Sequence, residues 1–118
     1  MTVKECYEAI ESDYNDVLSR LRTDERIQRF LLKVLEDGSY ELLVKSLEQR
    51  NMEEAFRAAH TLKGVCMNLS LTKLYQSSQA ITEALRNRTE YGDDLKPLLD
   101  KVTADYEFTM KHIRALVS

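Results

Sequence analysis

The sequence is poor in the residues that interrupt helices or cross-link a chain, with three glycines, one proline and two cysteines among 118 residues. The scarcity of glycine and proline, together with 31% charged residues and few runs of β-branched residues, favours an all-helical protein. No apolar run approaches the roughly 18 residues of a membrane span, and the first residues lack the basic-then-apolar pattern of a signal peptide. Cys6 and Cys66 lie far apart in the chain, so we expect reduced, structural thiols in a cytoplasmic protein.

Several classes of function lack their usual sequence signals. The net charge is −3, and the Lys and Arg residues are dispersed, so we do not expect nucleic acid to be the main partner. No glycine-rich loop is present that would bind a nucleotide phosphate. His60 and His112 have no cysteine or acidic residues at ligand spacing, so we expect no metal site and no cofactor. His112 lies near the end of a predicted helix, and we assign it no function.

Apolar residues recur at intervals of three and four along most of the chain, as in amphipathic helices. Four long helices are predicted over residues 38–50, 52–69, 71–87 and 94–117, and their short connections predict antiparallel neighbours. The predicted fold is therefore all-α, an antiparallel up-down four-helix bundle over residues 38–117. Additional short N-terminal helices over residues 3–36 should cap one end, which makes residues 1–118 a single domain.

The predicted helix ends depend on a few polar residues. Ser12 or Asp13 is expected to cap a helix that begins near Tyr14. Asp37-Gly38-Ser39 is expected to end one helix on glycine and to cap the next on serine. The apolar residues expected to face the core on either side of this break are Ile27, Phe30, Leu31, Val34, Leu35, Leu42, Leu43 and Leu47.

The helix predicted over residues 52–69 has one apolar face and one face that displays a histidine. The apolar stripe consists of Ala55, Ala58, Ala59, Leu62, Val65, Cys66 and Leu69. His60 projects away from this stripe, with Lys63 and Gly64 one turn along on its side. A glycine inside a helix costs about 1 kcal/mol relative to alanine. Gly64 is thus either a tolerated defect or a site of close approach by a partner's backbone or phosphate.

The segment His60-Thr61-Leu62-Lys63-Gly64, preceded by Ala58-Ala59 and followed by Asn68-Leu69, resembles the signature of histidine-containing phosphotransfer (HPt) domains. This resemblance implies a helical bundle in which His60 carries a phosphoryl group between response-regulator receiver domains. It can be followed by pattern from about Tyr14 to Arg86. Family members usually have glycine after the Asn-Leu pair, whereas this chain has Ser70, which indicates a changed turn and could cap the next helix.

The chemistry of the displayed histidine is consistent with this resemblance. A neutral imidazole is a competent nucleophile toward an acyl phosphate such as phosphoaspartate. Lys63 could pair with the phosphoryl oxygens as a mobile charge. Some HPt domains place Gln and Arg near the histidine from the following helix; Thr82 does not match the Gln, so only Arg86 is carried over as a phosphate-supporting residue.

Two apolar side chains, Phe56 and Met67, also project on the His60 side of the helix. One interpretation is peripheral packing against a neighbouring helix, and the other is an exposed rim that docks a receiver domain. The Gln79, Thr82 and Arg86 side chains are expected to form an ordinary solvated line on the next helix.

These observations predict a phosphorelay intermediate of two-component signal transduction. His60 would accept a phosphoryl group from a receiver phosphoaspartate and pass it to another receiver, and any Mg²⁺ would belong to the partner receiver. Nothing in 118 residues could be an ATP-binding kinase domain, so the protein is predicted to be a phosphocarrier and not an enzyme. The alternatives are a direct substrate domain of a histidine kinase, as in chemotaxis-type signalling, and a docking module that sequesters receivers. The cognate partners, the direction of transfer and the oligomeric state do not follow from the sequence.

Overall fold

The computed structural model describes residues 1–117, and within this range every regular element is an α-helix. The seven helices are α1 (Val3–Ala9), α2 (Tyr14–Leu21), α3 (Asp24–Val34), α4 (Ser39–Glu48), α5 (Met52–Asn68), α6 (Thr72–Leu85) and α7 (Leu95–Arg114). The predicted helical regions are confirmed, with ends that differ by a few residues. Among residues 1–117, no helix combines the length and the apolar character needed to span a membrane.

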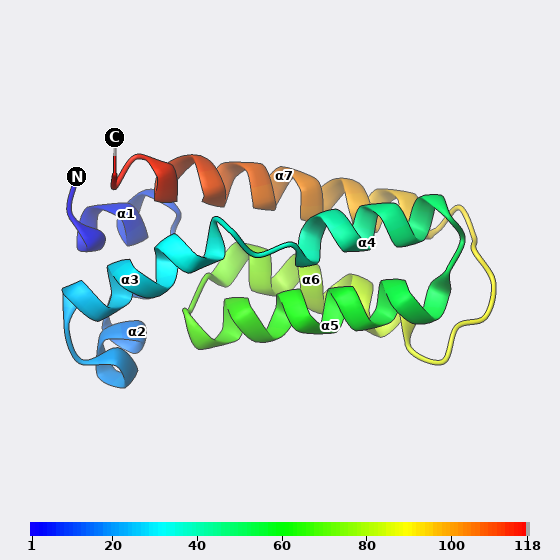
Figure 1. The fold of residues 1–118 in the computed structure, drawn as a ribbon, viewed down its shortest axis with the longest axis horizontal. Helices are drawn as coiled ribbons and strands as arrows, with labels where there is room; N and C mark the ends of the chain where they lie inside the picture. The colour runs from blue at the N-terminus through cyan, green and yellow to red at the C-terminus, as the bar shows by residue number, and fades with distance from the viewer. Residues whose placement is uncertain (118) are drawn as a thin grey trace.

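Helices α4 to α7 form an antiparallel up-down bundle, which confirms the predicted fold class (Figure 1). Helix α5 packs against both α4 and α6, and α6 packs against α7. The molecule is elongated, with extents of 43 × 25 × 20 Å. The short helices α1 to α3 lie at the end of the bundle where both chain termini are found (Figure 1).

A continuous core runs through the bundle and under the short helices. Its fully buried members from α5 are small, with Ala55, Ala59 and Cys66 each 0% exposed, so neighbouring helices can approach α5 closely. Two residues expected in the core are not there, since Phe30 and Leu42 are 41% and 43% exposed. Helix α4 buries the side that carries Leu43 and Leu47, which leaves Leu42 outside.

Side-chain caps fix most of the helix starts. Asp13 caps α2, where its carboxylate accepts a hydrogen bond from the Asp16 backbone N–H at 2.9 Å. This settles the choice between Ser12 and Asp13. The expected Ser39 cap is wrong: Gly38 is the N-cap of α4 without a side-chain bond, and the Asp37 carboxylate accepts from the Ser39 N–H at 2.9 Å.

The two cysteines are free and buried. Burial raises the pKa of the Cys6 thiol to about 11, and burial also raises the pKa of the Cys66 thiol. A neutral thiol is a poor nucleophile, so neither side chain has the character of a reactive cysteine.

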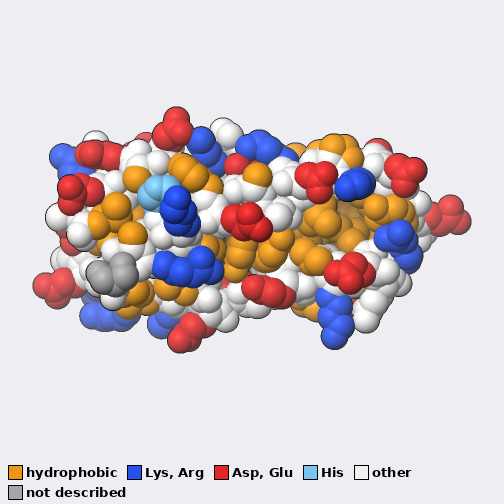
Figure 2. Space-filling view, turned by 90° about the horizontal axis from the view of Figure 1, so that it is seen from above, with side chains coloured by type: hydrophobic (Ala, Val, Ile, Leu, Met, Phe, Trp, Pro, Cys, Tyr) orange, Lys and Arg blue, Asp and Glu red, His pale blue; other side chains and the backbone are white. Residues whose placement is uncertain are grey.

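Helices α4 and α7 meet through aromatic side chains. The rings of Tyr40 and Tyr106 stack with their centroids 4.1 Å apart, and the Tyr40 hydroxyl lies 2.8 Å from the Thr103 hydroxyl. Helices α4 and α7 also border a cavity of about 250 Å³, whose apolar lining residues are Val44, Leu47, Tyr91, Leu95 and Leu99. In the view from above, hydrophobic side chains gather over the half of the molecule that contains α4 (Figure 2).

Replacing Tyr7 by phenylalanine tests whether α1 belongs to the same cooperative unit as the bundle. The buried Tyr7 hydroxyl donates a 2.7 Å hydrogen bond to the backbone carbonyl of Leu69, at the end of α5. Tyr7→Phe leaves that carbonyl without its partner, so we expect the free energy of unfolding to fall by about 1–2 kcal/mol in urea denaturation. Tyr75→Phe is the matched control, because the Tyr75 hydroxyl makes no hydrogen bond to the described part of the chain. Equal losses in both variants would contradict the assigned bond.

Candidate functional site

Helix α5 presents His60 to solvent because its opposite face is buried. The helix begins at an Asn51 cap, whose side chain accepts from the Glu54 N–H at 3.1 Å. Ala59 and Leu62 are 0% and 2% exposed, whereas His60 and Thr61 are exposed. The predicted orientation of His60, away from the apolar stripe, is therefore observed.

His60 lies at the edge of a shallow, open depression between α5 and α6. The depression has a volume of about 390 Å³ and is lined by Phe56, Arg57, His60, Thr61 and Arg86. The ring of Phe56 lies one turn before His60, with the two ring centroids 6.0 Å apart. Arg86, the C-cap residue directly after α6, places its guanidinium carbon 5.3 Å from the centroid of the Phe56 ring. The structure thus brings His60, Phe56 and Arg86 together.

Two of the three cations near His60 are already paired with carboxylates. Arg86 donates from Nη2 and Nε to the Glu83 carboxylate, at 2.9 and 3.3 Å. Arg57 is paired with Glu53 and with Glu54. The carboxylates were missed in the sequence analysis, although the spacing of Glu83 and Arg86 at i, i+3 is typical of such a pair.

Lys63 is half-buried and makes no ion pair within residues 1–117. Its charge still acts on the site, because it lowers the pKa of Glu83 together with Arg86, whose hydrogen bond is the larger cause. Among the cations beside His60, Lys63 is therefore the one with no carboxylate of the described residues in direct contact.

The remaining predicted residues of this face divide into packed and open positions. Phe56 is half-buried and packs against the core and Arg86, as the packing interpretation predicts. Met67 is 54% exposed. Beyond the local backbone of α5, no atom of residues 1–117 lies within 4 Å of the position that a Gly64 side chain would take, so packing inside the described chain does not require glycine there.

The polar line expected on α6 is wrong in one position. Thr82 is 0% exposed, and its hydroxyl donates to the backbone carbonyl of Ser78 at 2.6 Å. It belongs to the core seam, because its own helix satisfies its hydroxyl. Gln79 and Arg86 are exposed, as predicted.

Ser70, which follows the Asn-Leu pair, has a left-handed backbone with φ of 54°. Such a conformation favours glycine, so a serine here is strained and needs support. The Ser70 hydroxyl donates to the Asp16 carboxylate at 2.6 Å and accepts from Arg20. The expectation that Ser70 caps the next helix is wrong, since the N–H of Thr72 at the start of α6 donates to the Ser12 hydroxyl at 3.0 Å.

Arg20 of α2 caps the C-terminus of α5 from outside the bundle. Its Nη2 lies 3.1 and 2.9 Å from the carbonyl oxygens of Met67 and Asn68. Helix α5 has no basic residue in its own last turn, so Arg20 supplies the positive charge that a helix C-terminus favours. Sequence patterns had given no signal for this contact, which joins residues about fifty positions apart.

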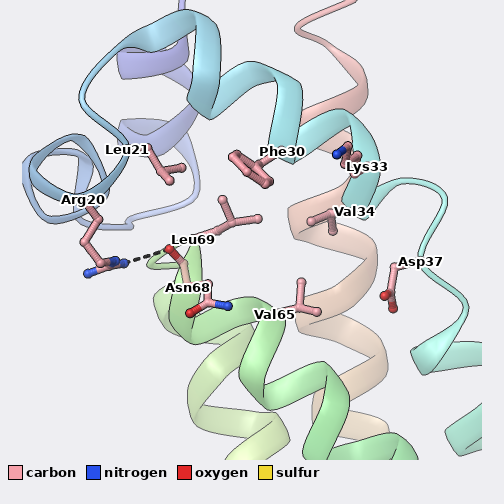
Figure 3. Close-up of a pocket in the computed structure, with 9 residues that line it drawn as sticks. All are labelled: Arg20, Leu21, Phe30, Lys33, Val34, Asp37, Val65, Asn68 and Leu69. Atoms are coloured by element: carbon pink, nitrogen blue, oxygen red, sulfur yellow. Dashed lines mark hydrogen bonds between the residues drawn. The ribbon is translucent and has the colours of Figure 1, made fainter.

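An apolar groove lies beside this contact, between α2, α3 and the last turns of α5 (Figure 3). Its volume is about 350 Å³, and its floor consists of Leu21, Phe30, Val34, Val65 and Leu69. The exposed Phe30 and the half-buried Val65, both expected in the core, line this groove. Arg20, Lys33, Asp37 and Asn68 form its polar rim.

Comparison with protein-family models gives a match to the Hpt domain over residues 16–116. The chain belongs to the Hpt domain family. Hpt domains are phosphotransfer modules of two-component signalling that interact with receiver domains and kinases, and they are phosphocarriers rather than kinases. The comparisons with curated proteins and with solved structures found no match. In this Hpt domain, no group of three or more His, Cys, Asp or Glu within residues 1–117 is arranged to hold a metal ion.

Replacing Arg20 by alanine tests the cap on α5. The variant removes the cation from the carbonyls of Met67 and Asn68 and leaves Ser70 with one partner fewer. We expect the free energy of unfolding at pH 7 to fall by about 1–2 kcal/mol in urea denaturation. Arg29→Ala on the exposed face of α3 is the control, with an expected change within about 0.5 kcal/mol.

The stability difference between wild type and Arg20→Ala should also depend on pH. Hydrogen bonds from Ser70 and Arg20 hold the pKa of the Asp16 carboxyl below its usual range. A lowered pKa stabilises the fold above the unfolded value of about 3.9, and this stabilisation is lost as the pH falls through the folded value. The stability difference between wild type and Arg20→Ala should therefore narrow below about pH 4. A constant difference from pH 7 to pH 3 would contradict the Asp16 contact.

Proposed function

We propose that this Hpt domain accepts a phosphoryl group on His60 from the phosphoaspartate of a receiver domain and passes it to the aspartate of another receiver. The observation that carries the proposal is the exposed His60 at the middle of α5, in the segment His60-Thr61-Leu62-Lys63-Gly64, beside an open depression with cations on its borders. The exposed imidazole makes no hydrogen bond within residues 1–117, so it is free to reach a phosphorus atom held by another protein.

The proposed transfer is a direct exchange of bonds at phosphorus. A lone pair of a neutral imidazole nitrogen attacks the phosphorus, and the new P–N bond forms as the P–O bond to the aspartyl carboxylate breaks. The carboxylate leaves with the electron pair and remains on the receiver. The product is a phosphoramidate, which is reactive enough to give its phosphoryl group to a second aspartate by the reverse exchange.

Lys63 and Arg86 are the proposed supporting cations. A phosphoryl group adds between one and two negative charges near neutral pH. Within residues 1–117, Lys63 has no carboxylate in direct contact, so it can move toward the phosphoryl oxygens as a point charge. Arg86 borders the same depression as His60 and offers a planar donor group. Neither residue needs to act as an acid or a base.

The partner is proposed to approach over Gly64. The missing side chain leaves the surface one turn after His60 open, and the exposed Met67 extends this surface by another turn. Phe56 borders it from the other side. A metal ion for the reaction is assigned to the receiver's aspartate site, and none is proposed for this chain.

Two other functions use the same face differently. A domain phosphorylated directly by a kinase would carry the phosphoryl group on His60 but would not need a donor receiver. A docking module would bind receivers without any transfer. The open surface at Gly64 fits all three, whereas the cations around His60 favour the two phosphoryl-carrying functions, because binding alone needs no charge beside the histidine.

A His60→Gln variant separates carrying from docking. Wild type incubated with a phosphorylated receiver should gain a label that is stable in alkali and lost in acid, as expected for phosphohistidine, and His60→Gln should gain none. His112→Gln is the matched control and should label like wild type. Binding of the receiver by wild type without any label would leave the docking module as the function.

A Gly64→Ala variant tests the proposed approach of the partner. The added methyl group would meet no atom of residues 1–117 within 4 Å beyond the local helix backbone, so alanine should raise the free energy of unfolding by up to about 1 kcal/mol through its better helix propensity. Transfer from the receiver should nevertheless slow, because the methyl group intrudes on the partner. Faster or unchanged transfer in this more stable variant would show that no close approach occurs at Gly64.

A further inference from the structure

The carboxylate of Glu83 touches the cation that borders the depression beside His60. It receives two hydrogen bonds from Arg86, from Nη2 at 2.9 Å and from Nε at 3.3 Å. The positive charges of Arg86 and Lys63 both favour its ionised form. A single carboxylate on α6 is thus electrostatically coupled to both proposed supporting cations.

Phosphorylation of His60 would place a second anion within reach of the same cations. Arg86 and His60 line one depression, and the Phe56 ring lies near both, 5.3 Å from the Arg86 guanidinium and 6.0 Å from the His60 ring. The side chains of Arg86 and Glu83 are 47% and 54% exposed, so their ion pair is weak and can exchange partners. The Nη1 group of Arg86 makes no hydrogen bond within residues 1–117 and is free to begin this exchange.

We propose that Glu83 is a positioning residue that competes with the phosphoryl group on His60 for Arg86. In the unphosphorylated protein Glu83 holds Arg86, and after phosphorylation Arg86 divides its contacts between the carboxylate and the phosphoryl oxygens. The phosphoryl group is consequently held less firmly than an unpaired Arg86 would hold it, which favours its transfer to a partner. This inference rests on the proposed phosphorylation of His60.

Arg57 also borders the depression, but its ion pairs do not involve Glu83. Arg57 is paired with Glu53 and Glu54 on its own helix α5. From α6, Glu83 and Arg86 are the charged side chains in contact with the depression or with its cations. The weaker hold on the phosphoryl group should therefore depend on the Glu83 carboxylate, and Glu83 should act mainly on the Arg86 guanidinium.

The test uses the whole chain phosphorylated by phosphoramidate, so that no receiver contributes to the result. The P–N bond to His60 forms as the P–N bond of phosphoramidate breaks, and ammonia leaves. The pKa of the phosphoryl group is then measured by ³¹P NMR titration between pH 6 and pH 9. Nearby cations lower this pKa and nearby anions raise it, whereas a residue with only a structural role leaves it unchanged.

Glu83→Gln keeps the size and one acceptor oxygen of the side chain but removes its charge. We expect it to lower the pKa of the phosphoryl group by roughly 0.2 to 0.7, the effect of one exposed ion pair. Arg86→Ala should raise the pKa. In the Arg86→Ala background, Glu83→Gln should produce a clearly smaller decrease than it does alone. Glu107→Gln on the exposed face of α7 is the matched control and should change nothing.

An unchanged or raised pKa of the phosphoryl group in Glu83→Gln would overturn the proposed competition. A raised pKa would mean that Glu83 instead holds Arg86 in place for the phosphoryl group. An equal decrease with and without Arg86 would overturn the route through Arg86. A wild-type protein that forms no phosphohistidine, with His60→Gln giving the same spectrum, would overturn the proposed function and this inference together. If wild type gives a normal phosphohistidine signal and the expected pKa changes are not seen, only the proposed role of Glu83 is overturned.

Discussion

Helix α5 has to be buried on one side and bare on the other, and the rest of the structure depends on this constraint. The buried side is built from small residues such as Ala55 and Ala59, so α4 and α6 can both pack against it closely. The outer side carries His60, Gly64 and Met67 and is left uncovered by both neighbours. A larger residue in the alanine stripe would separate the helices and change how α6 presents Arg86 to His60.

The short N-terminal helices stabilise the far end of α5. Tyr7 of α1, Asp16 and Arg20 of α2 and Ser12 of the connection between them all make contact at the turn from α5 to α6. These contacts hold Ser70 in a conformation that glycine would adopt with little strain. Side chains from the N-terminal helices therefore stabilise Ser70 where glycine would be expected, and the turn from α5 to α6 is retained.

Much of the fold and the centre of the site could be predicted from the sequence, because both depend on local periodicity. The spacing of Ala58, Leu62 and Cys66 fixes the buried face of α5, and His60 is then exposed by geometry alone. Errors arose where a residue's environment is set by distant elements. Phe30 and Leu42 fit the apolar stripe of their helices but lie beyond the neighbours that would cover them. Thr82 has a polar side chain, but it can be buried because its hydroxyl is hydrogen-bonded within its own helix. The Arg20 cap and the role of Asp16 depend on contacts across about fifty residues, which periodicity does not report.

The pairing of charges around His60 has a consequence for how a partner is found. Arg57 is paired with two carboxylates and Arg86 with one, so these three carboxylates balance the charges of Arg57, Arg86 and Lys63. Such short-range pairs produce a weak field at distances greater than the Debye length of about 8 Å. Encounter rates at this face should consequently depend little on ionic strength, and discrimination between similar partners has to come from the shape of the uncovered surface rather than from long-range attraction.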